Sequence, residues 1–234
     1  MTEPHSARGH SQPGHSRADR LHEGPLSGRQ AEAARNDLRI LESARAVFVA
    51  DPGAPITAVA KHAGVGISAL YTRYASKEDL LRKLCTDGLN IFVAETERAL
   101  EQLEHGHDHW QVFAEFMANL VDADTTSMTL ALAGKFTPTP GMFALANHSA
   151  ELSEELFGLI RDVLRPDVSL HDVSLVFELV AAIKIPPAER TRQLRRRYLA
   201  LILDGLRARD HGELPGPPPT WPELSDRWIP ATNL

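Results

Sequence analysis

The feature that most constrains the fold is the segment 56–74, in which two short helical patterns are joined by a glycine turn. Pro55 stands at the entrance of the first pattern, where its missing N–H does no harm. Gly64-Val65-Gly66 separates the two patterns. The first pattern repeats apolar residues on one face: Ile56, Val59, Ala60 and Ala63. Two short helices with a glycine-containing turn are typical of a helix-turn-helix.

The second short helix, residues 67–74, has a packing side and an exposed side. Leu70 and Tyr74 are four residues apart, so they share one face and can pack against the first helix. The exposed pairs are then Ser68 with Thr72 and Ala69 with Arg73. Arg73 can fork onto a phosphate or a guanine edge, and the hydroxyl of Tyr71 can reach a backbone phosphate. Spacing alone leaves open both DNA binding and an ordinary helical hairpin within a bundle.

Helical patterns cover most of the chain, up to about residue 209. Residues 31–50 form an amphipathic pattern, which the prolines and glycine of residues 51–55 bring to an end. Ser76 and Asp79 make a start similar to a capping box for a long helix. No segment alternates convincingly like a strand. The sequence therefore predicts an all-α fold, with an N-terminal three-helix domain that contains the helix-turn-helix and a larger C-terminal helical domain.

Composition and pattern divide the chain into four parts. Residues 1–30 are poor in apolar residues and cannot repay the entropy of ordering, so we expect a disordered arm. Residues 31–78 form the predicted helix-turn-helix domain, and residues 79–210 form the larger helical domain. Residues 211–234 are rich in proline and are expected to be extended.

Several classes of protein are disfavoured by the composition. The single cysteine, Cys85, allows no internal disulfide and no cysteine zinc site, which fits a reducing cytoplasm. No run of about 18 apolar residues could span a membrane, and the first residues lack the apolar segment of a secretory signal. Nucleophile-elbow, phosphate-loop and zincin motifs are absent from the sequence, so we expect neither an enzyme nor a cofactor.

The net charge of −6 is distributed unevenly. Residues 1–87 hold 12 Lys and Arg against 10 Asp and Glu, a balance of +2. Residues 88–234 hold 13 against 21, a balance of −8. A polyanion such as double-stranded DNA would therefore prefer the first part of the chain, although a balance of +2 also arises by chance.

A run of 18 residues in this region resembles a known family. From Ala63 to Leu80 the chain reads A-G-V-G-I-S-A-L-Y-T-R-Y-A-S-K-E-D-L. TetR-type transcriptional regulators carry A-G-V-x-x-G-T-L-Y-x-x-F-x-S-K-E-x-L, and residues 35–84 as a whole look like their DNA-binding domain. This resemblance implies that residues 66–73 enter the major groove and that Tyr71 and Lys77 contact phosphates. The implied DNA-binding residues are Gly66, Ile67, Ser68, Ala69, Tyr71, Thr72, Arg73 and Lys77.

The chain departs from the family pattern at two places. Ser68-Ala69 stands where the family usually has Gly-Thr, so the usual threonine hydrogen bond to DNA is absent. Pro55 stands where a Thr or Ser often caps the second helix. Both departures leave the fold intact and make an unusual operator sequence the expectation.

The resemblance also implies a homodimer built by two large C-terminal helices, here about residues 171–185 and 188–209. Candidate interface residues are Val176, Val180, Tyr198, Leu199, Ile202 and Leu206. The alternative is that these side chains belong to the core of one chain. The basic run 195–197 is expected to be a solvated face or the edge of the dimer, far from DNA.

TetR-like proteins typically hold a small ligand among their central helices, so the larger domain is expected to bind ligand as well as dimerise. Candidate pocket residues are Trp110, Phe113, Phe116, Met117, Phe136, Met142, Phe143 and Phe157. Their aromatic character suits a lipophilic effector of unknown identity, although a plain core role is open for each. Histidines 105, 107 and 109 with Asp108 could ligate a metal, but no partner ligands are obvious, and none is expected.

The functional hypothesis is a one-component transcriptional regulator. A homodimer would repress by binding a palindromic operator, and a small molecule would release it. The alternative is a helical module that binds a small molecule or a metal without regulating DNA. The S-K-E helix start together with Tyr71 favours the regulator, because a pure binding module has no reason to carry them.

Overall fold

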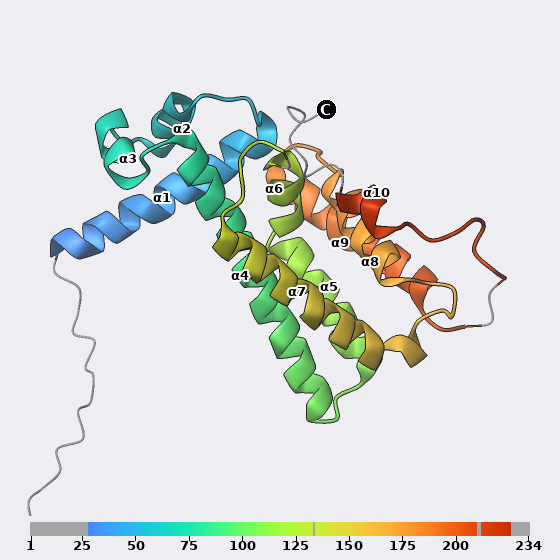
Figure 1. The fold of residues 1–234 in the computed structure, drawn as a ribbon. Coiled ribbons are helices and arrows are strands. Elements are labelled where there is room, and N and C mark those ends of the chain that lie inside the picture. Colours follow the sequence, from blue (N-terminus) through green and yellow to red (C-terminus); the bar gives the residue numbers. More distant parts are fainter. Residues whose placement is uncertain (1–27, 133, 210–211, 226–234) are drawn as a thin grey trace, which may run out of the picture.

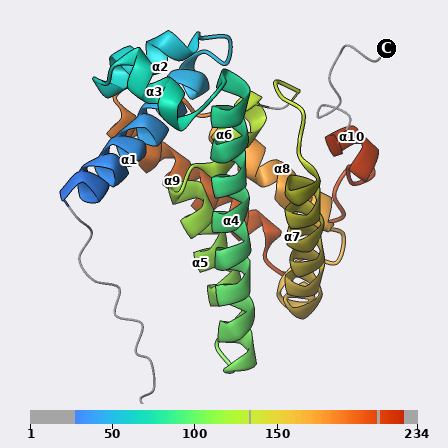
Figure 2. The ribbon, with the colours of Figure 1, turned by 60° about the vertical axis from the view of Figure 1, so that its left-hand side comes forward.

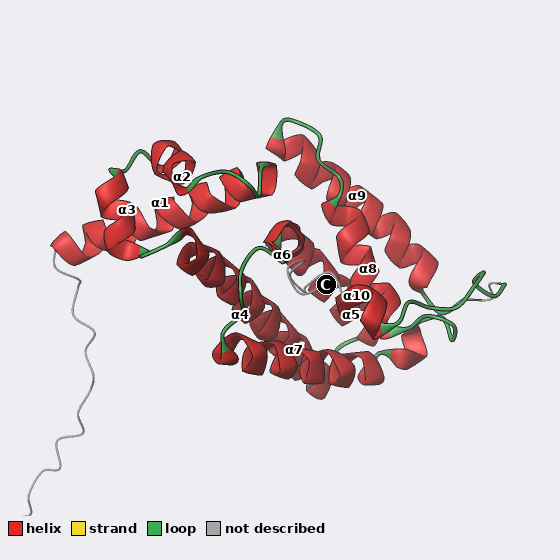
Figure 3. Ribbon diagram, turned by 45° about the horizontal axis from the view of Figure 1, so that its top comes forward, coloured by secondary structure: helices red, strands yellow, loops and turns green. Residues whose placement is uncertain are grey.

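The computed structural model describes residues 28–132, 134–209 and 212–225. The described part is helical and contains no β-strand, as the sequence predicted (Figures 1 and 3). The expected arm lies mostly outside the described residues. The helices are α1 (Gly28–Ala50), α2 (Ile56–Ala63), α3 (Ile67–Arg73), α4 (Lys77–Glu104), α5 (His109–Asp122), α6 (Thr125–Leu132), α7 (Pro140–Leu159), the 3₁₀ helix η1 (Arg161–Val163), α8 (Leu170–Ala181), α9 (Ala188–Leu206) and α10 (Trp221–Ser225).

The turn between α2 and α3 is set by local backbone chemistry. Gly64 has a φ of 63°, a left-handed conformation that glycine adopts without the clash of a Cβ. The amide of Val65 then donates to the carbonyl of Ala60 at 3.1 Å, which closes the end of α2. Arg39 of α1 reaches the same turn and donates from Nη2 to the carbonyl of Ala63 at 2.7 Å. The turn is therefore held by its own backbone and by α1.

Helix α4 connects the helix-turn-helix region to the rest of the molecule. Ser76 is its N-cap and accepts a hydrogen bond from the amide of Asp79 at 3.0 Å, as the predicted start requires. The helix then runs for 28 residues away from α2 and α3 and alongside α5 and α7 (Figure 1). Its first turns, up to Cys85, therefore pack in the N-terminal domain, and its remainder packs in the larger one.

Two hydrophobic clusters make up the core. The N-terminal cluster contains the packing faces of α1, α2 and α3 and the first turns of α4, and it also receives Met128, Leu132, Phe136 and Met142 from α6, α7 and the segment between them. The C-terminal cluster is built from the rest of α4 with α5, α7, α8 and α9. Helix α6 thus contributes to the core beneath the helix-turn-helix, although it belongs to the larger domain of the sequence prediction.

The structure differs from two expectations about the C-terminal region. Helix α8 ends at Ala181, four residues earlier than expected, and the chain continues to α9 through Pro186 and Pro187. The proline-rich tail was expected to be extended, yet its described part contains the short helix α10. The amide of Thr220 donates to the carboxylate of Glu223 at 2.7 Å, which satisfies a donor at the start of that helix.

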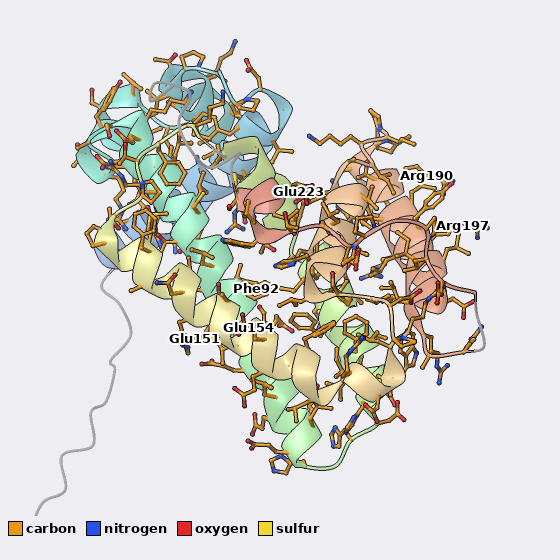
Figure 4. The ribbon with its side chains drawn as sticks, turned by 45° about the vertical axis from the view of Figure 1, so that its right-hand side comes forward. Phe92, Glu151, Glu154, Arg190, Arg197 and Glu223 are labelled. Carbon is orange, nitrogen blue, oxygen red and sulfur yellow. The ribbon has the colours of Figure 1, made fainter. Side chains whose placement is uncertain are left out.

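The expectation of a solvated basic run at 195–197 is wrong for its first member. Only 5% of Arg195 is exposed, and its guanidinium donates to the carboxylate of Asp124 at 2.6 Å and to Ser127 Oγ at 3.0 Å. Arg196 and Arg197 are exposed, and Figure 4 shows Arg197 on the outer edge of α9. Consecutive residues of a helix point about 100° apart, so the three arginines cannot share one face, and here Arg195 is the one that faces the core.

Candidate DNA-binding and ligand sites

Helix α3 presents the exposed face that a recognition helix needs. Leu70 is fully buried and Tyr74 is largely buried, so both point into the N-terminal cluster. The opposite side is open. Figures 1 and 2 show α3 at one end of the molecule, and Figure 1 shows α8 and α9 on the other side of α4. The exposed residues on and next to this helix are Gly66, Ile67, Ser68, Ala69, Tyr71, Thr72 and Arg73. The hydroxyl of Thr72 donates to the carbonyl of Ser68 at 2.8 Å, within the helix.

Arg73 has a partner that the sequence did not reveal. Its Nε donates to Oδ1 of Asp37 on α1 at 3.0 Å. The hydroxyl of Tyr74 donates to the same oxygen at 2.8 Å. Burial opposes the charged carboxylate, but the hydrogen bonds from Arg73 and Tyr74 prevail and lower the pKa of Asp37 below its ordinary value. A separation of 36 residues hides this contact from any local pattern.

Lys77 is also engaged within the chain. Its ammonium donates to the carbonyl of Pro52 at 3.1 Å and to that of Ala54 at 2.7 Å. The same nitrogen lies 5.0 Å from the centre of the Phe48 ring. The ammonium therefore ties the start of α4 to the turn after α1, and two of its three donors are already occupied.

A cavity of about 210 Å³ lies within the C-terminal domain. Phe113, Phe116 and Phe157, which the sequence suggested, line it. Phe92 and Phe177 line it as well, and Figure 4 shows Phe92 on α4 on the side that faces α8. The other lining residues are Thr126, Thr129, Ser153, Leu156, Ile160, Leu170, Val173, Ser174 and Glu178. Helices α4 to α8 therefore all contribute to one pocket.

The remaining pocket candidates lie elsewhere. Trp110 and Met117 belong to the C-terminal cluster but do not line the cavity, and the Trp110 ring packs under the guanidinium of Arg207 at 5.0 Å. Phe136 and Met142 are buried in the N-terminal cluster. Phe143 is exposed on α7. Aromatic residue type was enough to place some candidates in the domain that holds the cavity. The direction in which each side chain points from its helix, and the fold of the α6–α7 segment, decided whether it lines the cavity.

The cavity wall is apolar with a small polar set. Two threonines of α6 and two serines of α7 and α8 contribute hydroxyl groups. Glu178 of α8 contributes the one ionisable side chain among the described residues that line the cavity. No sequence signal marked it, because a glutamate at this point of α8 is equally compatible with a solvated face.

The dimer candidates divide between the core and the surface. Val176, Val180 and Leu199 are buried within the C-terminal cluster of one chain, and Ile202 and Leu206 are packed against that cluster. Tyr198 is about half exposed, at 49%. The most exposed large apolar residues of these helices are Leu179 at 63% and Leu201 at 59%, which were not among the candidates.

The histidine-rich loop has structural roles in this chain. The carboxylate of Asp108 accepts a hydrogen bond from the amide of Gln111 at 2.8 Å and so caps α5. His105 Nδ1 lies 2.7 Å from the carbonyl of Glu101. Within the described residues no group of three or more His, Cys, Asp or Glu side chains is arranged to hold a metal ion. None of the helices in the described part is long and apolar enough to cross a membrane.

The regular structure of the described residues is helical, and α2 and α3 have the arrangement of a helix-turn-helix whose second helix is exposed. Residues 40–84 match the family model described as bacterial regulatory proteins, tetR family. The match covers the helix-turn-helix and the start of α4, so residues 40–84 are similar to the tetR-family regulators in sequence. Proteins of this family generally bind DNA and respond to ligands, and they are transcription regulators and not enzymes.

Solved structures share the fold at low sequence identity. The TetR-like regulator LfrR from Mycobacterium smegmatis, in complex with proflavine, is 20% identical, with a TM-score of 0.52, over 71% of this chain and 95% of that one. The TetR-family regulator PfmR from Thermus thermophilus is 23% identical, with a TM-score of 0.50, over 73% of this chain and 100% of that one. No curated protein matches the chain at a significant level.

Proposed function

We propose that this protein is a one-component repressor that binds a palindromic operator as a homodimer and is released by a lipophilic small molecule. It would act in the cytoplasm, where the DNA is. The observation that carries the proposal is the position of α6. This helix of 8 residues contributes both to the core beneath the helix-turn-helix and to the wall of the ligand cavity. DNA contact, dimerisation, ligand class and coupling each have their own support.

DNA contact would use the exposed face of α3. Tyr71 would bind a phosphate, while Ser68 and Arg73 would face the bases in the major groove. A single domain of this size offers few base contacts, and two copies on half-sites roughly 34–36 Å apart would supply the missing affinity. Lys77 is left out of the proposed contact set because its ammonium is engaged by the carbonyls of Pro52 and Ala54.

Dimerisation would use the exposed apolar side chains of α8 and α9. Leu179, Tyr198 and Leu201 are exposed in one chain, and a self-complementary contact between two copies would bury them. Val176, Val180 and Leu199 would support this surface from beneath, since they are already buried in the chain. The prolines and the charged first turns of α9 would lie towards the edge.

The effector would be largely apolar and carry a polar or cationic group. Five phenylalanines line the cavity, which suits an aromatic or other lipophilic skeleton. A carboxylate at the cavity wall attracts a cation or a hydrogen-bond donor, because hydrogen bonds to a charged acceptor are the strong ones. Glu178 would therefore face the polar end of the ligand. Proflavine, with which LfrR forms a complex, is an aromatic cation and is a suitable probe.

Coupling between the ligand cavity and the helix-turn-helix would run through α6. Thr126 and Thr129 line the cavity, whereas Met128 and Leu132 on the same helix are buried in the N-terminal cluster. A ligand that moves the lining side of α6 must move the buried side with it, because a packed helix shifts as a unit. The coupling free energy that such regulation needs is modest, about 1–3 kcal/mol.

A second connection lies at the start of α4. The carboxylate of Glu78 accepts the amide N–H of Thr137 at 2.9 Å, and Nε of Arg82 donates to the carbonyl of Thr137 at 3.0 Å. The segment between α6 and α7 is thereby clamped to the helix that follows the helix-turn-helix. Movement of α6 would reach the recognition helix through this clamp as well as through the shared core.

The test is a selection of duplexes from a random DNA pool with the full chain, followed by mobility-shift titrations on the enriched duplex. We expect salt-sensitive binding that Arg73→Ala weakens. If no duplex is enriched, or if binding is indifferent to Arg73, the chain is not this kind of regulator. In the alternative of a small-molecule binder without DNA regulation, Arg73→Ala would change nothing.

Ligand release is tested separately with proflavine and the enriched duplex. Proflavine should weaken DNA binding by the wild-type chain. Ser174→Phe should abolish this effect, because the larger side chain fills the cavity, while Ser174→Ala should preserve it. An equal response from both variants would show that the cavity is not the effector site.

A further inference from the structure

We infer that Asp37 of α1 is a specificity-determining residue, which holds Arg73 as a reader of base edges and keeps it from acting as a general phosphate anchor. The inference rests on the proposed DNA-binding function and deepens it. Asp37 lies outside the recognition helix, and neither its residue type nor its position in α1 marks it in the sequence.

The geometry fixes one end of the Arg73 guanidinium. Nε of Arg73 lies 3.0 Å from Oδ1 of Asp37, and this bond uses one of the five N–H donors of the side chain. The terminal amino groups, with four N–H donors, lie outside this bond. The Arg73 side chain is 47% exposed and that of Asp37 is 23% exposed, so the pair stands at the rim of the exposed face.

Tyr74 fixes the carboxylate in turn. Its hydroxyl donates to Oδ1 of Asp37 at 2.8 Å, and its ring is buried in the N-terminal cluster. Burial, and then the hydrogen bond to Asp37, raise the pKa of Tyr74 well above its ordinary value, so the hydroxyl remains a donor. A buried ring therefore holds the carboxylate, and the carboxylate holds the arginine.

The negative charge of Asp37, like its hydrogen bond to Arg73, favours sequence discrimination over general affinity for DNA. A carboxylate beside the DNA surface repels phosphates, which lowers affinity for every sequence alike. An arginine without this partner would be free to reach phosphates of any duplex, and such contacts carry no sequence information. An arginine that is held at Nε retains the planar pair of amino groups with which guanine is recognised. Asp37 thus lowers general affinity and preserves discrimination.

The experiment compares the enriched duplex with a scrambled duplex of the same length and composition over a series of salt concentrations. Asp37→Ala should bind the scrambled duplex more tightly than the wild type does. Its specificity ratio should fall at least about tenfold, the loss expected when one base contact is no longer directed. The slope of log affinity against log salt on the scrambled duplex should steepen by about 0.9 for each subunit, one additional phosphate contact.

Three further variants separate the roles of Arg73, of the Tyr74 hydroxyl and of the charge of Asp37. In the double variant Asp37→Ala/Arg73→Ala the additional salt dependence should disappear, because it comes from the released arginine. Tyr74→Phe removes the hydroxyl that holds Asp37 but keeps the Arg73–Asp37 pair, so its specificity ratio should fall, and by less than that of Asp37→Ala. Asp37→Asn, which removes the charge and keeps an acceptor oxygen, repeats the test with a smaller effect on folding.

An unchanged specificity ratio in both Asp37 variants would overturn the inference. So would a steeper salt slope that survives the removal of Arg73, since the charge of Asp37 would then act without the arginine. Failure of the wild-type chain to enrich any duplex has a different meaning, because it contradicts the proposed function itself.

Discussion

Arg195 of α9 donates from Nη1 to Oδ1 of Asp124 at 2.6 Å, and this bond joins the last large helix to the junction of α5 and α6. Asp124 has a φ of 51°, a left-handed conformation that lets the chain turn sharply between the two helices. The same guanidinium donates to the carbonyls of Ala181 at 2.9 Å and Ile183 at 3.1 Å. One buried side chain therefore connects the proposed dimer helices to the start of the helix that lines the cavity.

Arg195→Met should destabilise the protein by about 2–4 kcal/mol, because buried acceptors would lose a charged donor. Chemical denaturation at a fixed protein concentration measures this loss. Arg196→Met is the matched control. Arg196 pairs with Asp122 at the surface, and removing an exposed pair should leave the free energy of unfolding nearly unchanged. Equal effects of the two variants would mean that the buried connection does not stabilise the fold.

Gly64→Ala should destabilise the helix-turn-helix by about 1–2 kcal/mol, because an L side chain is strained at a φ of 63°. The space itself is sufficient, since the nearest atom to an added Cβ is Nη2 of Arg39 at 3.6 Å. Gly66→Ala serves as the control in the same turn. Gly66 has a φ of −65° and no atom within 4 Å of an added Cβ, so its cost should stay near 0.5 kcal/mol or below. Thermal unfolding followed by circular dichroism distinguishes the two.

Lys77→Met should destabilise the N-terminal domain by about 1–3 kcal/mol, because the carbonyls of Pro52 and Ala54 lose their charged donor. The apolar stem is kept, so packing near Phe48 is preserved. Lys61→Met, at an exposed position of α2, should be close to neutral. The salt slope of DNA binding should not change in Lys77→Met. A decrease of about 0.9 for each subunit would instead show that Lys77 contacts a phosphate.

The contact between Asp167 and the C-terminal segment should depend on pH. Hydrogen bonds from Arg165 and from the backbone amide of Leu214 lower the pKa of Asp167 to about 2, compared with about 3.9 in an unfolded chain. Because the folded pKa is the lower one, the stabilising effect is present above about pH 4 and is lost as the pH falls towards 2. Hydrogen-exchange protection of the Leu214 amide should decline over this range.

At neutral pH, Asp167→Asn should lower the protection of the same Leu214 amide, which now donates to the carboxylate at 2.7 Å. Glu213→Gln removes a neighbouring negative charge and controls for the change in net charge. If the two variants leave equal protection, the Asp167 contact does not hold the segment in place.

The positions of the helix-turn-helix elements could be predicted from the sequence because their signals are local. Gly64 can adopt the left-handed turn, Ser76 can cap α4, and the four-residue spacing of Leu70 and Tyr74 places both on one face. Each of these signals depends on residues only a few positions apart. The exposed face of α3 follows from the same helical spacing, since the side chains that do not pack inward must face the solvent.

The sites were less predictable because they depend on contacts between distant segments. Asp37 meets Arg73 across 36 residues, and Arg195 meets Asp124 across 71. Phe136 and Phe113 are both aromatic, yet one is buried beside the helix-turn-helix and the other lines the cavity. No property of either residue alone could have separated them, because the path of α6 and α7 decides which cluster each one joins.

The sequence by itself determined the helical class, the recognition motif and the start of α4, since short-range hydrogen bonding and helix periodicity are properties of neighbouring residues. The tertiary structure decided which charged groups are paired and which aromatic side chains enclose the cavity. It also placed α6 between the helix-turn-helix core and the cavity. These outcomes depend on how whole helices pack, and packing brings together residues whose separation along the chain carries no signal of contact.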